Sequence, residues 1–356
     1  MHGFIKDIII KNHGQENYTK ITSNNLIKFI NSKTKSYNKD AKSRANYGTL
    51  YAIYVVIEDY IEKGYSSMEK DYSLYEGANY TPLFAKMRSM PFGSKLQNHP
   101  LNNRVNSEFK KTYEESGNII ERDQEKQKYW INEKLLLIDG INISKTILEI
   151  IDKYIEIKKD NLSQFIEECK KLEKNNDIHE IMKFIKIHIA PNADARRFEI
   201  ISFAILKNYY SEFSIWYGTS KENVNETELK LYKTGRTNAN DGGIDFILLP
   251  KGEIFQVTET LDFTKYFLDI DKLNKFPISF VVKKEEDSDS VFEKIRQSAQ
   301  KKYEDQSVLN KYMESINKII TIKNLNEYID YVYKKNKITQ VLDDIILESE
   351  VEYNFN

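Results

Sequence analysis

Two oxygen-bearing side chains, Asp245 and Gln256, lie on either side of a short turn in the segment 234–260, TGRTNANDGGIDFILLPKGEIFQVTET. Each belongs to a short apolar run, and Pro-Lys-Gly at 250–252 separates the two runs, which predicts an antiparallel hairpin. Because side chains alternate along a strand, Gln256 and Thr258 share one face. The hairpin would therefore bring Asp245 beside both of them at one edge of a sheet.

A carboxylate and an amide oxygen that converge in this way suit a hard cation such as Mg²⁺. The backbone carbonyl of Val257 would be available as a further oxygen ligand. The alternative is that Asp245 belongs to a turn and Gln256 is an ordinary polar residue on a half-exposed strand.

The same residues resemble the PD-(D/E)xK nuclease superfamily, whose core has a helix with Glu, a strand with Asp, and a strand with Glu or Gln before x-Lys. Glu199, on the predicted helix ARRFEIISFAILKNYY, matches the helical acid, while Asp245 and Gln256 match the two strand positions. The Gly-Gly-Ile-Asp form is similar to the Mrr-like branch. The resemblance covers roughly residues 191–303, and the whole chain resembles the ApaLI-like family of restriction enzymes.

The resemblance implies a type II restriction endonuclease that hydrolyses double-stranded DNA with Mg²⁺. It implies catalytic roles for Asp245, Gln256, Glu199 and Thr258, with Asp245, Glu199 and Val257 around the metal. A palindromic target would favour a homodimer, since each subunit then cuts one strand. A cognate methyltransferase would belong to the same system without forming a stable complex with this chain.

Thr258 departs from the motif, because it occupies the position of the lysine that orients water or stabilises charge on the phosphate. Lys251 or Lys265 would have to reach in from the flanking turn or helix, or a second metal would have to replace that cation. Two alternatives therefore stay open: a modification-dependent nuclease of the Mrr type, and a DNA-binding protein with a decayed nuclease core.

A second group of residues could contact DNA. The segment 86–111 is rich in Lys, Arg, Asn and Gln and contains a single acid, Glu108. Cations neutralise phosphates, whereas Arg, Asn and Gln can also bond base edges. A polar surface loop in an Asn-rich protein explains the same composition. The candidates for DNA binding are Lys95, Gln97, Asn98, His99, Asn102, Asn103, Arg104 and Asn106, together with Arg236, Asn238 and Asn240 before the predicted catalytic Asp.

Composition restricts the remaining possibilities. The 356 residues have a formal net charge of −1, so any binding to nucleic acid needs local basic patches. Cys169 is the only cysteine, which excludes a disulfide framework and a cysteine-built zinc site. No apolar stretch approaches the roughly 20 residues of a membrane span, and the first residues do not resemble a signal peptide. We therefore expect a cytoplasmic protein with no membrane partner.

The first half of the chain is predicted to be mainly helical. Helical spacing of apolar residues indicates helices over 44–60, 144–157 and 161–174. The charged stretch 120–134 is expected to be a solvated helix or arm, and Asp139-Gly140 suggests a short hairpin within 135–143.

The second half changes pattern near Pro191. We expect a helix over 194–210, strands near 213–217, 229–232, 244–249, 254–257 and 278–282, helices over 263–273 and 291–303, and a helical tail from Asn310. This order predicts an α/β fold with a restriction-endonuclease-like mixed sheet flanked by helices. The expected organisation is a mainly helical recognition and dimerisation region, 1–190, followed by a catalytic core with a helical tail, 191–356.

Overall fold

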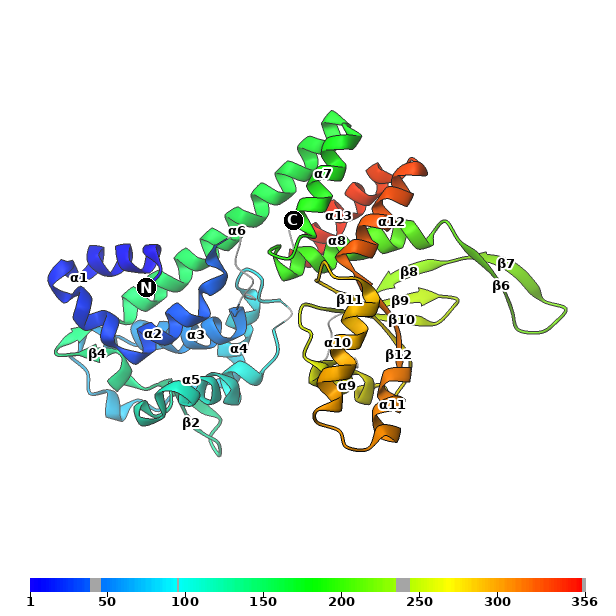
Figure 1. Ribbon diagram of the computed structural model, residues 1–356. Coiled ribbons are helices and arrows are strands. Elements are labelled where there is room, and N and C mark those ends of the chain that lie inside the picture. The colour runs from blue at the N-terminus through cyan, green and yellow to red at the C-terminus, as the bar shows by residue number, and fades with distance from the viewer. Residues whose placement is uncertain (39–45, 95, 235–243, 354–356) are drawn as a thin grey trace. The chain divides into compact units, whose positions relative to one another are not determined.

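The computed structural model describes residues 1–38, 46–94, 96–234 and 244–353 and has a mixed α/β fold (Figure 1). The chain divides into two units, Met1–Ser163 and Gln164–Asn356. The division falls inside the helix α6 (Ser144–Asn175), whereas the change of sequence pattern lies near Pro191. Within the described residues, no helix is both long enough and apolar enough to cross a membrane.

Unit 1 is built around the helix α3 (Tyr47–Glu62). Its sequence, YGTLYAIYVVIEDYIE, is apolar on most sides, which is typical of a helix that is surrounded by its neighbours. Accordingly, its apolar residues from Leu50 to Tyr60 are mostly buried in one core with residues of the other elements. Its neighbours in unit 1 include the helices α1 (Gly3–Ser23), α2 (Asn25–Lys33), α4 (Tyr80–Ser89) and α5 (Val105–Tyr113), the π-turn Pro100–Arg104 and the first part of α6.

The prediction of a solvated helix or arm over 120–134 is wrong. This segment forms β2 (Ile120–Asp123) and β3 (Lys128–Ile131), which pair antiparallel, with β1 (Ala78–Asn79) on the other side of β3. Tyr129 and Ile131 are buried, while Trp130 between them is half-exposed. This period of two outweighs the high charge of the segment.

Two other expectations for unit 1 have different outcomes. The hairpin at Asp139-Gly140 is confirmed: β4 (Leu137–Ile138) pairs with β5 (Ile141–Asn142), and both turn residues have positive φ. The two helices predicted over 144–157 and 161–174 are instead the single helix α6, because the residues between them include neither Gly nor Pro.

Unit 2 contains a five-stranded sheet with the strand order β12-β11-β10-β9-β8. The strands β8 (Lys230–Lys233), β9 (Phe246–Leu249) and β10 (Glu253–Thr258) are antiparallel neighbours. The strands β11 (Ile278–Val282) and β12 (Ile316–Thr321) continue the sheet in parallel with β10. The predicted mixed sheet and its central hairpin are thus present.

Helices cover both faces of this sheet (Figure 1). On one face, α8 (Ala195–Tyr210) packs Phe203 against Phe246 and Tyr210 against Phe255. It also contacts α12 (Ile322–Lys334) and α13 (Ile338–Tyr353), and α7 (Ile178–His188) packs beside it. On the other face, α9 (Phe263–Lys272) packs Tyr266 against Phe280, in one core with α10 (Ser288–Gln300) and α11 (Gln306–Glu314).

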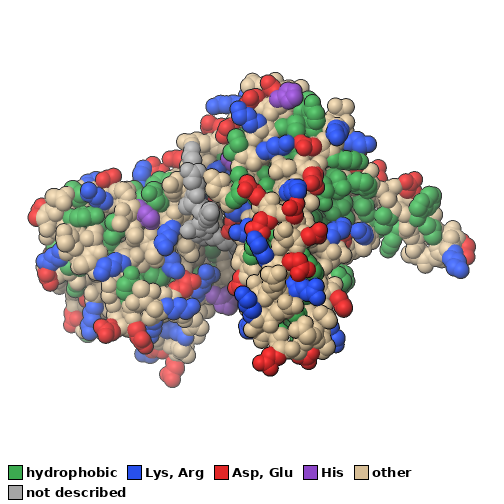
Figure 2. All heavy atoms as spheres, in the orientation of Figure 1, with side chains coloured by type: hydrophobic (Ala, Val, Ile, Leu, Met, Phe, Trp, Pro, Cys, Tyr) green, Lys and Arg blue, Asp and Glu red, His purple; other side chains and the backbone are tan. Residues whose placement is uncertain are grey.

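Two strands of unit 2 lie where none was expected. β12 interrupts the predicted helical tail, because Ile319 and Ile320 are consecutive buried residues, as in parallel strands that are covered on both faces. β7 (Val224–Glu228) lies in the predicted polar insertion and pairs with β6 (Ser214–Gly218). This two-stranded ribbon has hydrophobic side chains on its surface (Figure 2). Trp216 on β6 is one of the exposed hydrophobic residues.

Candidate active site

Backbone hydrogen bonds of the β9–β10 hairpin fix Asp245 in place directly before β9. Its amide nitrogen donates to the Phe255 carbonyl (2.8 Å), and its own carbonyl accepts from the Thr234 amide (2.9 Å). Its side-chain Oδ2 accepts from the backbone amide of Val257 (2.7 Å). The paired register ends with Phe246 opposite Phe255, so Asp245 and Gln256 are the next residues along the two chain segments. The hairpin thus brings the backbones of the two predicted residues close together.

The carboxyl group of Asp245 is in an environment that disfavours its charge. Burial, and then the nearby Glu199 carboxylate, raise its pKa from the ordinary 3.8 to about 7. The Val257 amide, Arg196 and Lys265 act in the opposite direction without cancelling this rise. A carboxylate held in such a place is stabilised by any additional cation that reaches it.

Glu199 is brought to the same place by α8. The helix starts at Asp194, whose side chain accepts hydrogen bonds from the amides of Arg196 and Arg197, as an N-cap residue does. One turn later Glu199 is buried, with 9% of its surface exposed. Both of its carboxylate oxygens accept from Nη1 of Arg196, at 2.6 Å each. Two acids and an arginine from α8 and β9 therefore form one electrostatic cluster.

Gln256 contributes an oxygen atom that has no partner. Its Oε1 is shielded from solvent, and no hydrogen-bond donor among the described residues reaches it. Its Nε2 is directed to the Val257 carbonyl, 3.3 Å away. A buried amide oxygen without a donor is destabilising unless a water molecule or a cation occupies the space beside it. Asp245 lies close by in the hairpin, and a carboxylate oxygen together with an amide oxygen would suit a hard cation.

Lys265 contacts Thr258, the residue that the resemblance aligns with the motif lysine. Lys265, on α9, donates from Nζ to Oγ1 of Thr258 (3.1 Å), and its positive charge acts to lower the pKa of Asp245. Lys251, the other candidate, lies at the opposite end of β10 and forms an ion pair with Glu253 (2.8 Å). Of these two lysines, Lys265 is therefore the one beside the site.

Lys283 is a residue that the sequence analysis missed. Its side chain, at the end of β11, is 3% exposed, pairs with Glu259 and donates to the carbonyl of Ala193 (2.7 Å). It therefore ties the start of α8 to the sheet and helps to position Arg196 and Glu199. Its position directly after the buried run 278–282 was the only signal in the sequence.

The possible metal ligands are few. Within the part of the chain that the structure describes, no three His, Cys, Asp or Glu side chains gather as a metal site. A cation here would take Asp245 and Glu199 as its carboxylates and Oε1 of Gln256 as a neutral ligand. The carbonyl of Val257, the fourth predicted ligand, faces the amide of Gln256.

The residues predicted to bind DNA in unit 1 fall into two groups. Asn106 is structural, because it bonds the backbone of Ile119 and Ile120, and Asn102 accepts from the Tyr129 hydroxyl. Arg104 is exposed and pairs with Glu108 (2.7 Å). The others that are described are exposed: Gln97, Asn98, His99 and Asn103. Lys95, Arg236, Asn238 and Asn240 lie outside the described residues.

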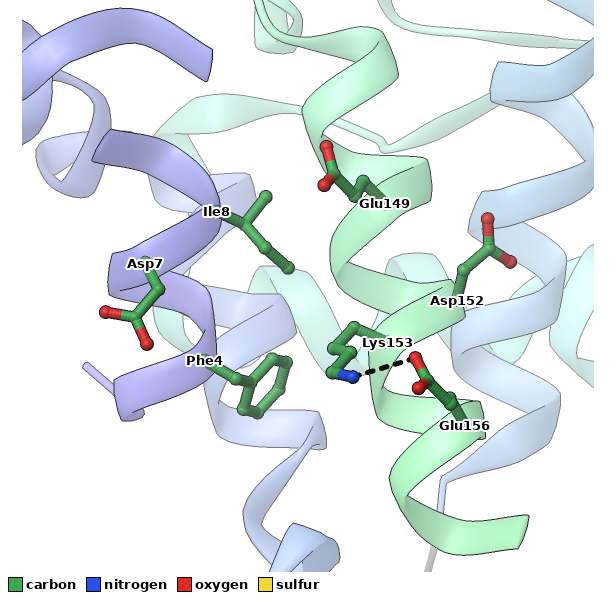
Figure 3. A pocket seen from close by; sticks show the side chains of 7 residues that line it. All are labelled: Phe4, Asp7, Ile8, Glu149, Asp152, Lys153 and Glu156. Carbon is green, nitrogen blue, oxygen red and sulfur yellow. Dashed lines mark hydrogen bonds and ion pairs between the residues drawn. The ribbon is translucent and has the colours of Figure 1, made fainter. Parts of the chain in front are cut away.

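A pocket of about 580 Å³ in unit 1 has the wrong charge for DNA (Figure 3). Its single lysine, Lys153, pairs with Glu156 (2.9 Å). The resulting excess of negative charge would repel a phosphate backbone. The residues that line it are Phe4, Asp7, Ile8, Glu149, Asp152, Lys153 and Glu156.

No family model, curated protein or solved structure matches this chain. The proposed function therefore depends on the geometry of the cluster around Asp245.

The raised pKa of Asp245 predicts how metal-free stability depends on pH. The folded chain binds more protons than the unfolded chain between about pH 4 and 7, so Asp245 lowers stability progressively as the pH rises through this window. Asp245→Asn keeps an acceptor for the Val257 amide without the charge. We expect it to raise the free energy of unfolding at pH 8 by on the order of 2 kcal/mol, or about 5 °C in Tm, and by much less at pH 4.

Thermal melting of both proteins in a metal chelator at pH 4, 6 and 8 measures this difference. A gain for Asp245→Asn that is equal at all three pH values, or largest at pH 4, would contradict the electrostatic description of the site.

Proposed function

We propose that this chain is a Mg²⁺-dependent endonuclease that hydrolyses phosphodiester bonds of double-stranded DNA, a type II restriction endonuclease of the PD-(D/E)xK type. The observation that carries the proposal is the pair of Asp245 and the unpartnered Gln256 oxygen at one end of the β9–β10 hairpin, with Lys265 beside them. The order of elements supports it: a helix with Glu199, an antiparallel hairpin, a helix and a parallel strand.

Asp245, Glu199 and the Gln256 amide oxygen would hold the ion. Mg²⁺, when bound, supplies polarisation of the phosphate and activation of water in such reactions. The buried carboxylates have little solvent to compete with, so their attraction for a divalent ion is stronger than at an exposed site. Val257 keeps Asp245 oriented through its amide.

Lys265 would supply the positive charge that the motif usually takes from the strand. Its ammonium group is anchored at Thr258, two residues after Gln256 and on the same face of β10. From there it can donate to a phosphate oxygen or orient the attacking water, and both actions stabilise negative charge as it develops. The function of the lysine is thus retained in this proposal while its position in the sequence changes.

The exposed polar residues between Gln97 and Arg104 are candidates for contacts with DNA, since Asn, Gln and Arg side chains bond base edges. A two-fold homodimer would allow both strands of a palindromic site to be cut. In this proposal the methyltransferase of the same system acts on its own.

One observation favours a second candidate, a DNA-binding protein with a decayed nuclease core. Arg196 already neutralises Glu199, so the cluster is compensated without a metal ion. Incubation of the purified protein with unmodified plasmid and Mg²⁺ separates the possibilities. Discrete fragments identify a restriction enzyme, cleavage of modified plasmid alone identifies a modification-dependent nuclease, and binding without cleavage identifies the decayed form.

Asp245→Asn should lower the rate of Mg²⁺-dependent plasmid cleavage by at least about 100-fold, because the ion loses its central carboxylate. Binding of the same DNA in a gel-shift assay should persist. Unchanged cleavage by Asp245→Asn would mean that the catalytic centre lies elsewhere.

Lys265→Ala should reduce cleavage about 100-fold, whereas the matched variant Lys251→Ala should cleave at nearly the original rate, because its partner Glu253 lies at the far end of β10. Lys265→Arg, which keeps the positive charge, should recover part of the activity. The assigned role of Lys265 is wrong if both alanine variants lose activity equally.

A further inference from the structure

Arg196 makes a close contact with Glu199 in the candidate site. Its Nη1 lies 2.6 Å from both oxygens of Glu199, one turn later on α8. The two side chains are only 14% and 11% exposed, so this ion pair is weakly screened by solvent. The charge of Arg196 also acts on Asp245.

This contact conflicts with metal binding. The guanidinium group of Arg196 neutralises the Glu199 carboxylate and repels a cation that approaches it, so this contact weakens metal binding. Among the described residues, the charges that act on Asp245 are the Glu199 carboxylate and the cations of Arg196 and Lys265. A divalent ion would add two positive charges to this cluster, and a scissile phosphodiester would bring one negative charge. Arginine bonds phosphate through its planar donors as readily as it bonds carboxylate.

We propose that Arg196 is a phosphate-binding residue that is held on Glu199 until DNA arrives. The phosphodiester then binds the guanidinium group in place of Glu199, and the Glu199 carboxylate becomes available to the metal. DNA and metal therefore bind cooperatively, each raising the affinity for the other by the same factor. This inference rests on the proposed nuclease function. In it, the contact between Arg196 and Glu199 keeps the affinity for metal low until substrate binds.

The adjacent arginine provides a matched control. The guanidinium group of Arg197 lies over the ring of Phe165, 4.6 Å from its centroid, on another side of α8. Removing its charge changes the net charge of the protein as much as removing that of Arg196. It leaves the contact between Arg196 and Glu199 in place.

Calorimetric titration with Ca²⁺, an oxygen-seeking ion, tests the inference. Without DNA, Arg196→Gln should bind Ca²⁺ about tenfold more tightly than the original protein, while Arg197→Gln should be unchanged. Adding Glu199→Gln to Arg196→Gln should remove the gain. In a second titration, a 30-bp duplex that spans a cut found in the plasmid assay should raise the affinity for Ca²⁺ about tenfold more in the original protein than in Arg196→Gln.

Arg196→Lys is the control for a folding defect, because it keeps the positive charge but lacks the planar pair of donors. It should show an intermediate affinity for Ca²⁺. The inference is overturned if Arg196→Gln and Arg196→Lys match the original protein in both titrations. Cleavage that still depends on Asp245 would show that the nuclease function holds in that case. If the chain shows neither cleavage nor Ca²⁺ binding that depends on Asp245, the nuclease function fails and this inference fails with it.

Discussion

The hydrogen bond from the Val257 amide to Oδ2 of Asp245 is the constraint on which the candidate site depends. It joins the residue directly before β9 to the next-to-last residue of β10. It also fixes the direction of a carboxyl group whose pKa is raised by burial. With Asp245 held in this way, Gln256 follows Phe255, the last residue of β10 that is paired with β9. A shift of one residue would move Gln256 and Thr258 to the face that α8 covers.

The elements around the hairpin bring charges to this point from both sides. From α8 come Glu199 and Arg196, held by the Asp194 cap and by the contact of Lys283 with the Ala193 carbonyl. From α9 comes Lys265, anchored on Thr258. Burial of several ionised groups is costly unless each has a partner, and Glu199 has one in Arg196, whereas the charge of Asp245 stays disfavoured. In the proposed function, this arrangement would accept a divalent ion and an anionic substrate together.

Local sequence patterns predicted the features that depend only on residues close together in the chain. The turn Pro250-Lys251-Gly252 between apolar runs was sufficient for the β9–β10 hairpin, and Asp194 was sufficient for the start of α8. The reach of Lys265 to Thr258 depends on how α9 packs on the sheet, so the sequence left it as one of two choices. β12 and Lys283 were missed because a short buried run beside helices has no distinctive period. The spacing of Arg196 and Glu199, three residues apart on a helix, did carry a signal for their ion pair.

The most direct test of the account is the position of a bound divalent ion. Crystals of the protein soaked in Mn²⁺, which takes the same oxygen ligands as Mg²⁺, can be measured for anomalous scattering. The account predicts a peak within about 2.5 Å of a carboxylate oxygen of Asp245 and of Oε1 of Gln256. A peak only in the acidic pocket around Glu149 and Asp152, with none beside Asp245, would contradict it.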